Sequence, residues 1–222
     1  MIDLEIIPKH ILLKVKVEDN GEELVDLRNE SPEILFEIAE YLDRNTATGS
    51  EFEDAHFVRE SVAKRIAQAQ RNLPEGLKLL IRCGYRTPAV QSRQYKLDYD
   101  ALLIEHPDWN KTELDVEIEN RTASVDVAPH CTGGAVDLTI VDSDGKQLDM
   151  GTKMGTFGSK THTCSNQISQ SARNNRIILL DAMTNAGFFN FPGEWWHFAY
   201  GDRDWAVINN THSIYGPIVK RR

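Results

Sequence analysis

The sequence predicts an α+β fold in which helices pack on a small, mainly antiparallel sheet. Helical periodicity dominates the first third of the chain, whereas the later part contains short apolar runs that are typical of strands. No repeat and no Pro-, Gly- or Ser-rich linker divides the 222 residues, so we expect one domain spanning residues 1–222. The 41% hydrophobic and 27% charged content is that of an ordinary folded protein.

Two helices and a strand are expected in the first 83 residues. The stretch 31–42 begins with Ser31 as a cap and Pro32 at the first helical position, and its apolar residues form one stripe. The stretch 57–73 repeats this pattern until Pro74 and Gly76 end it. Residues 77–83 then alternate apolar and polar side chains, which predicts a strand.

The remaining elements are expected to be mainly strands. A loop and a helix should follow in residues 84–103, and "AVDLTIV" predicts a strand over 135–141. "DSDG" is a turn sequence, which suggests a partner strand near 146–149. A long helix fits 166–186, capped by Ser165 and ended by Gly187. Residues 195–200 and 213–219 indicate further strands.

Composition excludes some classes of function. A net charge of −9 argues against a nucleic-acid-binding protein, because phosphate neutralisation requires clustered Lys and Arg. Three cysteines, Cys83, Cys131 and Cys164, cannot all pair, which fits a reducing compartment. We see neither a signal peptide nor an apolar run that could cross a bilayer. The cytoplasm is therefore expected, with the periplasm an alternative if a leader has been removed; the oligomeric state is left open.

Candidate metal ligands surround the strand 135–141. Its register places Asp137 between small side chains, on the face opposite Val136 and Leu138. A buried carboxylate requires a cation or several hydrogen-bond donors. Gly133-Gly134 would allow the chain to turn and bring His130 near Asp137. With His197 and a water molecule, these residues would form an open tetrahedral zinc site, in which the pKa of the water falls to about 7.

Two further residues could act beside such an ion. Glu194 could take a proton from the metal-bound water and give it to a leaving amine, while Trp195 and Trp196 exclude bulk water. This requires a bend at Pro192-Gly193, because residues three apart on a flat strand face opposite sides. Arg86, after the strand 77–83, could hold a substrate oxyanion or clamp a substrate carboxylate.

Each fragment taken alone also fits an ordinary structural role. A His and an Asp seven residues apart arise often by chance, aromatic neighbours usually belong to a core, and a lone arginine is usually a surface ion pair. Their combination in one chain favours a catalytic site, although spacing alone does not decide it.

The motifs "YRTP", "HCTGGAVDLTI", "LDMGT" and "GEWWHF", in this order, resemble the vancomycin-resistance D-alanyl-D-alanine dipeptidases. That family belongs to the zinc D-Ala-D-Ala metallopeptidases, which share a fold with the hedgehog signalling domain. The resemblance extends from about residue 77 onward. It implies one zinc ion held by His130, Asp137 and His197, with Glu194 as general base and Arg86 stabilising the tetrahedral intermediate. The implied substrate is a small dipeptide, and neither a nucleic acid nor a membrane is an expected partner. The resemblance also implies a cytoplasmic location.

The sequence departs from the family pattern at two places that concern the substrate's amino group. Ala128 stands where the family commonly has Ser, and "TKMGTFGSK" lacks the acidic residue that usually follows "LDMG". Glu117, Glu119 or Asp126 could substitute for that acid. The leading expectation is hydrolysis of D-Ala-D-Ala or a similar dipeptide. The alternatives are a carboxypeptidase or endopeptidase acting on longer peptidoglycan peptides and a catalytically silent zinc-binding domain.

Overall fold

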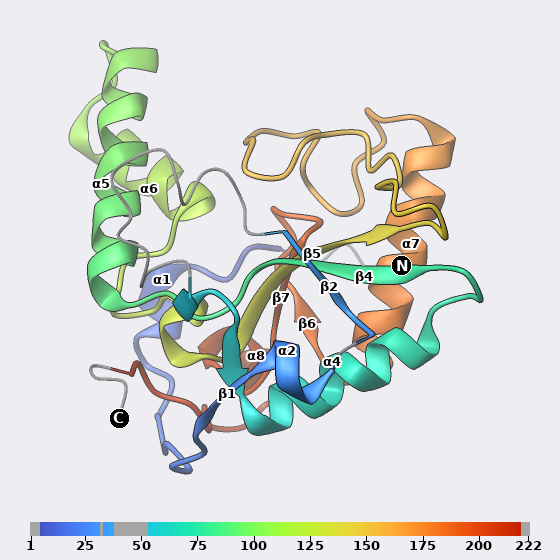
Figure 1. Ribbon diagram of the computed structural model, residues 1–222. Helices are drawn as coiled ribbons and strands as arrows, with labels where there is room; N and C mark the ends of the chain where they lie inside the picture. The colour runs from blue at the N-terminus through green and yellow to red at the C-terminus, as the bar shows by residue number, and fades with distance from the viewer. Residues whose placement is uncertain (1–4, 32, 38–52, 219–222) are drawn as a thin grey trace.

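A five-stranded sheet forms the centre of the computed structural model, which describes residues 5–31, 33–37 and 53–218 (Figure 1). The strand order is β2-β4-β5-β7-β6; only the β2–β4 pair is parallel. The strands are β2 (Leu35–Phe36), β4 (Lys78–Cys83), β5 (Ala135–Val141), β6 (Phe189–Asn190) and β7 (His197–Ala199). The expected α+β class with a small, mainly antiparallel sheet is confirmed.

Helices and one small second sheet surround these strands. A two-stranded antiparallel sheet pairs β1 (Leu24–Asp26) with β3 (Phe57–Arg59). The helices are α1 (Lys9–Leu12), α2 (Leu27–Glu30), α4 (Glu60–Asn72), α5 (Pro88–Glu105), α6 (Lys111–Arg121), α7 (Gln170–Thr184) and α8 (Arg203–Ile208), with a 3-10 helix at Pro129–Thr132. The pair α5 and α6 projects at the upper left in Figure 1.

The core lies between one face of the sheet and the helices α4 and α7, which pack against each other. Because side chains alternate along a strand, every second residue of β4 and β5 points to this side. These are Leu79, Ile81, Val136, Leu138 and Ile140, all fully buried. The apolar stripe of α4, with Val62, Ile66 and Ala69, covers them.

The opposite face of the sheet carries polar residues. In the antiparallel pairing of β5 with β7, Asp137 lies directly opposite His197. A bulge between Ile81 and Cys83 in β4 adds one residue to that strand and brings Cys83 opposite Asp137 on the other side. The centre of the sheet therefore presents a buried carboxylate between an imidazole and a thiol.

The predicted helix over 31–42 is wrong in its described part. Residues 33–37 contain β2, whose Leu35 and Phe36 pair with Leu80 and Ile81 of β4. Ile34 is buried and the next residue, Leu35, is exposed. Neighbouring side chains of a strand point to opposite sides in this way. Pro32 and residues 38–42 lie outside the described residues.

Three other boundaries or elements differ from expectation. Helix α7 begins at Gln170 and is capped by Ser169, whereas Ser165 accepts a hydrogen bond from Gln167 N in the preceding turn. Residues 146–149 form an isolated bridge, Val141–Gln147, instead of a strand. Residues 213–218 contribute only the bridge Val17–Ser213, because the chain turns back to the Gly201 carbonyl; residue 219 lies outside the described residues.

The other expected elements are observed with small shifts. Strand 77–83 corresponds to β4, strand 135–141 to β5, and the helix after residue 84 to α5. The predicted helix over 57–73 corresponds to α4, preceded by β3, and the aromatic strand is limited to His197–Ala199. Within the described residues, no helix combines the length and apolar character that crossing a bilayer requires.

Candidate metal centre

The structure brings His130, Asp137 and His197 together. His130 Nε2 lies 3.2 Å from Asp137 Oδ1 and 3.2 Å from His197 Nδ1, and His197 Nδ1 lies 3.0 Å from the same carboxylate oxygen. Each of the three side chains is at least nine-tenths buried. Three donor atoms from residues up to 67 positions apart in sequence thus face one point.

A turn at Gly133-Gly134 makes this arrangement possible. The 3-10 helix Pro129–Thr132 ends at Gly133, whose φ of 73° lies in the left-handed region that favours glycine. A Cβ on Gly134 would stand 2.5 Å from the Tyr200 carbonyl oxygen, so this position also excludes a side chain. The chain reverses within these two residues and directs the His130 ring back over β5.

Further hydrogen bonds orient two of the three side chains. His130 Nδ1 donates to the Gly84 carbonyl at 2.7 Å, which leaves the lone pair of Nε2 directed at the cluster. Arg86 Nη2 donates to Asp137 Oδ2 at 2.7 Å, so Oδ1 faces the two imidazoles. Arg86 Nε also approaches Cys83 Sγ at 3.2 Å. Arg86 therefore lies at the site and contacts the carboxylate directly.

The charges of the cluster shift its pKa values. Burial, reinforced by the charge of Arg86, lowers the pKa of His130 to about 4, so its ring is neutral at neutral pH. Burial would raise the pKa of Asp137, but His130, His197 and Arg86 together hold it well below its usual range. Burial would likewise lower the pKa of His197, but Asp137 raises it. The site thus contains a carboxylate anion and a neutral imidazole, the forms in which these residues bind metals.

Glu194 lies in the turn before β7, as its proposed role requires. Glu194 N donates to the Phe191 carbonyl and His197 N donates to the Glu194 carbonyl, so residues 191–197 bend before the strand begins. One donor atom from each of Asp137, Glu194 and His197 lies within 4.8 Å of the others. Burial raises the pKa of Glu194 to about 8, with Asp137 adding to the shift. A nearby cation would lower this pKa and favour the base form.

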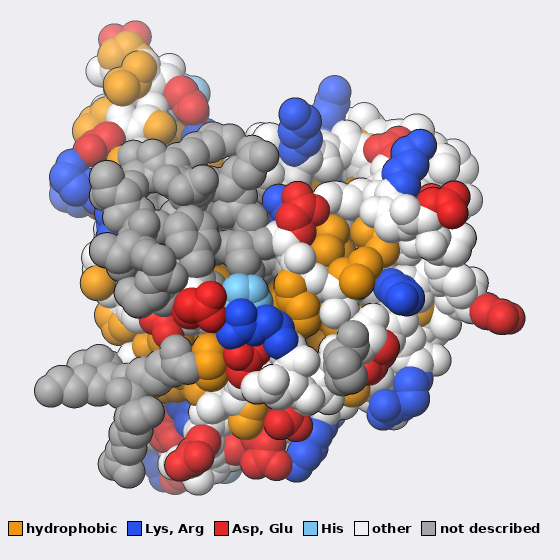
Figure 2. All heavy atoms as spheres, in the orientation of Figure 1, with side chains coloured by type: hydrophobic (Ala, Val, Ile, Leu, Met, Phe, Trp, Pro, Cys, Tyr) orange, Lys and Arg blue, Asp and Glu red, His pale blue; other side chains and the backbone are white. Residues whose placement is uncertain are grey.

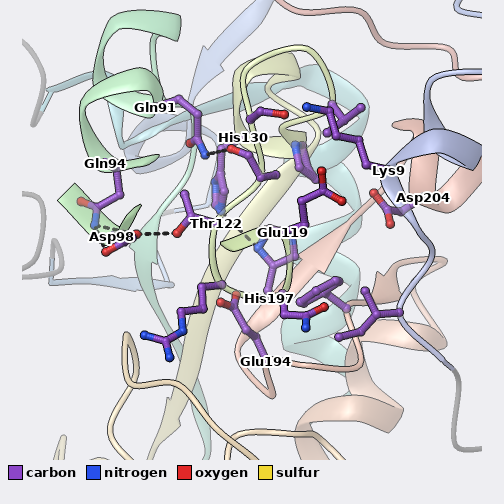
Figure 3. A pocket seen from close by; sticks show the side chains of 18 of the residues that line it. Lys9, Gln91, Gln94, Asp98, Glu119, Thr122, His130, Glu194, His197 and Asp204 are labelled. Carbon is purple, nitrogen blue, oxygen red and sulfur yellow. Dashed lines mark hydrogen bonds between the residues drawn. The ribbon is translucent and has the colours of Figure 1, made fainter. Parts of the chain in front are cut away.

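These residues line a cavity of about 610 Å³ (Figure 3). The view shows Asp98 on one side of His197 and Glu194, and Asp204 on the other. Trp196 and Phe191 contribute apolar walls, and Trp195 is buried behind them in the core. Residues 6–10 of the amino-terminal segment and Phe157 of the loop before α7 also line the cavity.

Among the acids considered as substitutes for the missing one, only Glu119 lines this cavity within the described part of the chain. Glu117 pairs with Arg121, and Asp126 pairs with Lys9 and Ser124. Sequence reasoning missed Cys83, whose Sγ lies within 4.8 Å of donors of His130 and Asp137. It also missed Asp98 and Asp204, which line the cavity from α5 and α8. Neither has a local motif, so only the tertiary fold reveals them.

Comparison with known proteins identifies the family. The model of the Peptidase_M15 family, described as D-ala-D-ala dipeptidase, matches residues 20–216. The chain belongs to this family. It is a metallopeptidase, and the resemblance inferred from its motifs is confirmed.

Relatives in the Peptidase_M15 family are similar over most of their length. The D-alanyl-D-alanine dipeptidase of Escherichia coli is 29% identical over 79% of this chain and 83% of its own. That of Synechocystis is 27% identical over 71% of this chain and 74% of its own. A crystal structure of the vancomycin-resistance D,D-pentapeptidase VanY with Zn(II) aligns over 90% of this chain and 94% of that chain, at 13% identity. Its TM-score of 0.43 is too low to transfer roles of residues.

The donor set fits a zinc ion. Two imidazole nitrogens and one carboxylate oxygen are ligands that zinc prefers in catalytic sites, where a fourth position stays open. In a tetrahedral site with Zn–N distances of about 2.0–2.1 Å, neighbouring donors are separated by roughly 3.3 Å. The observed separations of 3.0–3.2 Å are close to that spacing.

Proposed function

We propose that the protein is a zinc-dependent dipeptidase that hydrolyses D-alanyl-D-alanine, or a similar small D,D-dipeptide, to free amino acids. The observation that carries the proposal is the convergence of His130, Asp137 and His197 beside Glu194 in one cavity of a Peptidase_M15 chain. We propose one zinc ion per chain, held by the three residues of the cluster, in a single catalytic domain. The cytoplasmic location stays a prediction.

Zinc supplies a Lewis acid that acidifies a water molecule and polarises the scissile carbonyl. Glu194 accepts a proton from the attacking water and donates it to the leaving amine, a role supported by its place in the bend beside the cluster. The buried ring of Trp196, on the cavity wall, keeps bulk water away from Glu194 on that side, which strengthens its interaction with neighbouring charges. Trp195 packs in the core instead.

Arg86 has two tasks in this proposal. Its contact with Asp137 Oδ2 fixes the orientation of a metal ligand, and its place on the cavity wall allows a guanidinium N–H to stabilise the oxyanion that develops on the carbonyl. Gln91, which is buried, accepts from Arg86 Nη1 at 3.5 Å and donates to the Ala123 carbonyl at 2.7 Å. Gln91 thereby supports the guanidinium from the helix α5.

The substitution Glu194→Gln tests the proposal. It keeps the shape of the side chain but removes the base, so hydrolysis of D-Ala-D-Ala should fall by about 10²–10⁴-fold. Zinc content, measured by elemental analysis, should stay at one per chain. Asp144→Asn, in the exposed turn after β5, is the control and should retain turnover. Undiminished turnover in Glu194→Gln would refute the role of the base.

The size of the cavity favours a second candidate, a carboxypeptidase or endopeptidase acting on longer peptidoglycan peptides. About 610 Å³ lies in the range of about 300–1,000 Å³ that holds drug-sized ligands, whereas D-Ala-D-Ala is far smaller. Faster cleavage of an acylated peptide ending in D-Ala-D-Ala than of the free dipeptide would favour this candidate. Bound zinc without hydrolysis of either compound would instead support the silent zinc-binding domain.

A further inference from the structure

Asp204, on α8, is a buried carboxylate that opens into the cavity. The residue is 6% exposed and lines the same cavity as the metal cluster, and Figure 3 shows its side chain directed inward. Its carboxylate accepts no hydrogen bond from another residue and forms no ion pair within the part of the chain that the structure describes. The favourable electrostatic influences on it come from His197 and from its own backbone N–H.

Such a group is costly to the folded state unless a cation compensates it. Moving a carboxylate out of water without a partner costs several kcal/mol in proteins, so natural structures pair or protonate it. Asp202 adds to this cost of burying negative charge, because it is 1% exposed and its Oδ2 has no hydrogen-bond partner among the described residues. Two neighbouring buried acids therefore have no ion-pair partner among the described residues; the charge of His197 acts on both, and Asp204 lines the cavity.

A purely structural role for Asp204 does not explain this placement. An acid in the first turn of a helix is favourable, but it is equally so when exposed, without loss of solvation. In α8 the cap is already provided by Asp202, whose Oδ1 accepts from Trp205 N at 2.9 Å. Asp204 thus adds nothing to the helix that would require its burial.

The other acids of the cavity are already compensated or more exposed. Asp98 accepts hydrogen bonds from the Gln94 amide and from the Thr122 hydroxyl. Glu119 is only half-buried, and the charge of Lys9 acts on it. Asp204 differs from both, because it is nine-tenths buried, borders the cavity and has no hydrogen-bond or ion-pair partner from another residue in the described ranges.

We infer that Asp204 binds a primary ammonium group of the peptide substrate. The inference rests on the proposed function, since it takes the cavity to be the substrate site. An ammonium group suits the position because it offers three donors and a full positive charge to an unpaired carboxylate. Two sources share this chemistry: the α-ammonium of a free dipeptide and the side-chain ammonium of a lysyl residue in a longer peptide.

Binding without turnover tests the inference. Isothermal titration calorimetry on zinc-loaded Glu194→Gln, with and without Asp204→Asn, would use D-Ala-D-Ala, N-acetyl-D-Ala-D-Ala and N-acetyl-L-Lys-D-Ala-D-Ala. Asp204→Asn should raise the Kd of an ammonium-bearing peptide about 10- to 100-fold, the effect of losing a charged hydrogen bond, and leave that of N-acetyl-D-Ala-D-Ala unchanged. An effect on the dipeptide identifies the α-ammonium, and an effect on the lysyl peptide identifies the side chain.

Controls separate this inference from the proposed function. Asp144→Asn, in the exposed turn after β5, should not change the selectivity between the peptides in the same background, and zinc content and Tm establish that each variant is folded and loaded. Equal Kd changes for all three peptides, no change, or no preference of the parent for ammonium-bearing peptides would overturn the role of Asp204. Failure of hydrolysis in the protein with Glu194 intact would overturn the dipeptidase proposal alone, because the binding experiment does not depend on turnover.

Discussion

The acids on α8 have a thermodynamic consequence that is independent of any substrate. Burial raises the pKa of Asp204, the charge of Asp202 raises it further, and burial likewise raises the pKa of Asp202. A carboxyl whose pKa is higher in the folded state binds its proton more tightly there than in the unfolded chain. The free energy of unfolding therefore falls as the pH rises above the ordinary carboxyl pKa of about 3.9.

Asp204→Asn should stabilise the metal-free protein at high pH. At pH 4 both forms carry a neutral side chain, so their Tm values should be similar. At pH 8.5 the variant avoids a buried charge and should gain about 1–3 kcal/mol, or several degrees in Tm. Differential scanning fluorimetry in the presence of a chelator measures both, with Asp144→Asn in the exposed turn after β5 as control. A Tm difference that does not grow with pH would contradict the expected cost of Asp204.

At the scale of single residues, the sequence predicted the site where a residue's type and position allow few structural roles. His130, Asp137 and His197 could be selected because strand register, a Gly-Gly turn and ligand chemistry all restrict the choice. Asp204 could not be selected, since an acid near a helix start is common and its burial depends on α8 packing near the amino-terminal segment. Cys83 faces Asp137 only through a bulge that no sequence pattern indicates.

The loop between β5 and α7 depends on one buried arginine. Arg176, on α7, is 2% exposed and donates to the carbonyl groups of Met150, His162 and Lys160. Burial lowers its pKa to about 10, so it stays charged at neutral pH. One guanidinium thus binds three carbonyl groups of the loop. We therefore expect the loop to have a fixed shape where Phe157 borders the cavity.

Arg176→Lys should release this loop while keeping the charge. One ammonium group cannot reach three separate carbonyls with the geometry of a guanidinium, so buried acceptors lose partners and stability should fall by at least about 2 kcal/mol. Hydrogen exchange should accelerate in residues 150–163, and KM should rise because part of the cavity wall becomes mobile. Arg71→Lys, at an exposed position of α4, is the control. Unchanged exchange in 150–163 would show that the loop is held by other contacts.

At the scale of elements, long periodic segments were predictable and short ones were not. Helices α4 and α5 and strands β4 and β5 agree with their sequence patterns because their own residues supply most of the signal. The two-residue strand β2 was mistaken for a helix, since its pairing with β4 decides its conformation. Ser165 and Ser169 are the same residue type and are equally suitable as N-caps. The contacts of the loop in the folded protein decide that Ser169 caps α7.

Across the whole molecule, the sheet separates packing from chemistry. One face is covered by α4 and α7, while the other carries Asp137 and His197 on strands whose positions that packing fixes. On the face shown in Figure 2, the acidic and basic side chains of the described residues are scattered among one another. The cluster thus joins the 3-10 helix, β5 and β7, so an ion bound there would connect distant parts of the chain.

Zinc should therefore stabilise the entire fold. Because the unfolded chain cannot bring His130, Asp137 and His197 together, an ion that binds only the folded state adds about 2.7 kcal/mol at a concentration 100-fold above its Kd. For a chain of this size the Tm should rise by about 5–10 °C. Calorimetric scans with and without zinc measure the shift, which His130→Ala should abolish and His162→Ala, at an exposed histidine, should preserve. An undiminished Tm shift in His130→Ala would show that the ion binds elsewhere, because this variant lacks one of the three proposed ligands.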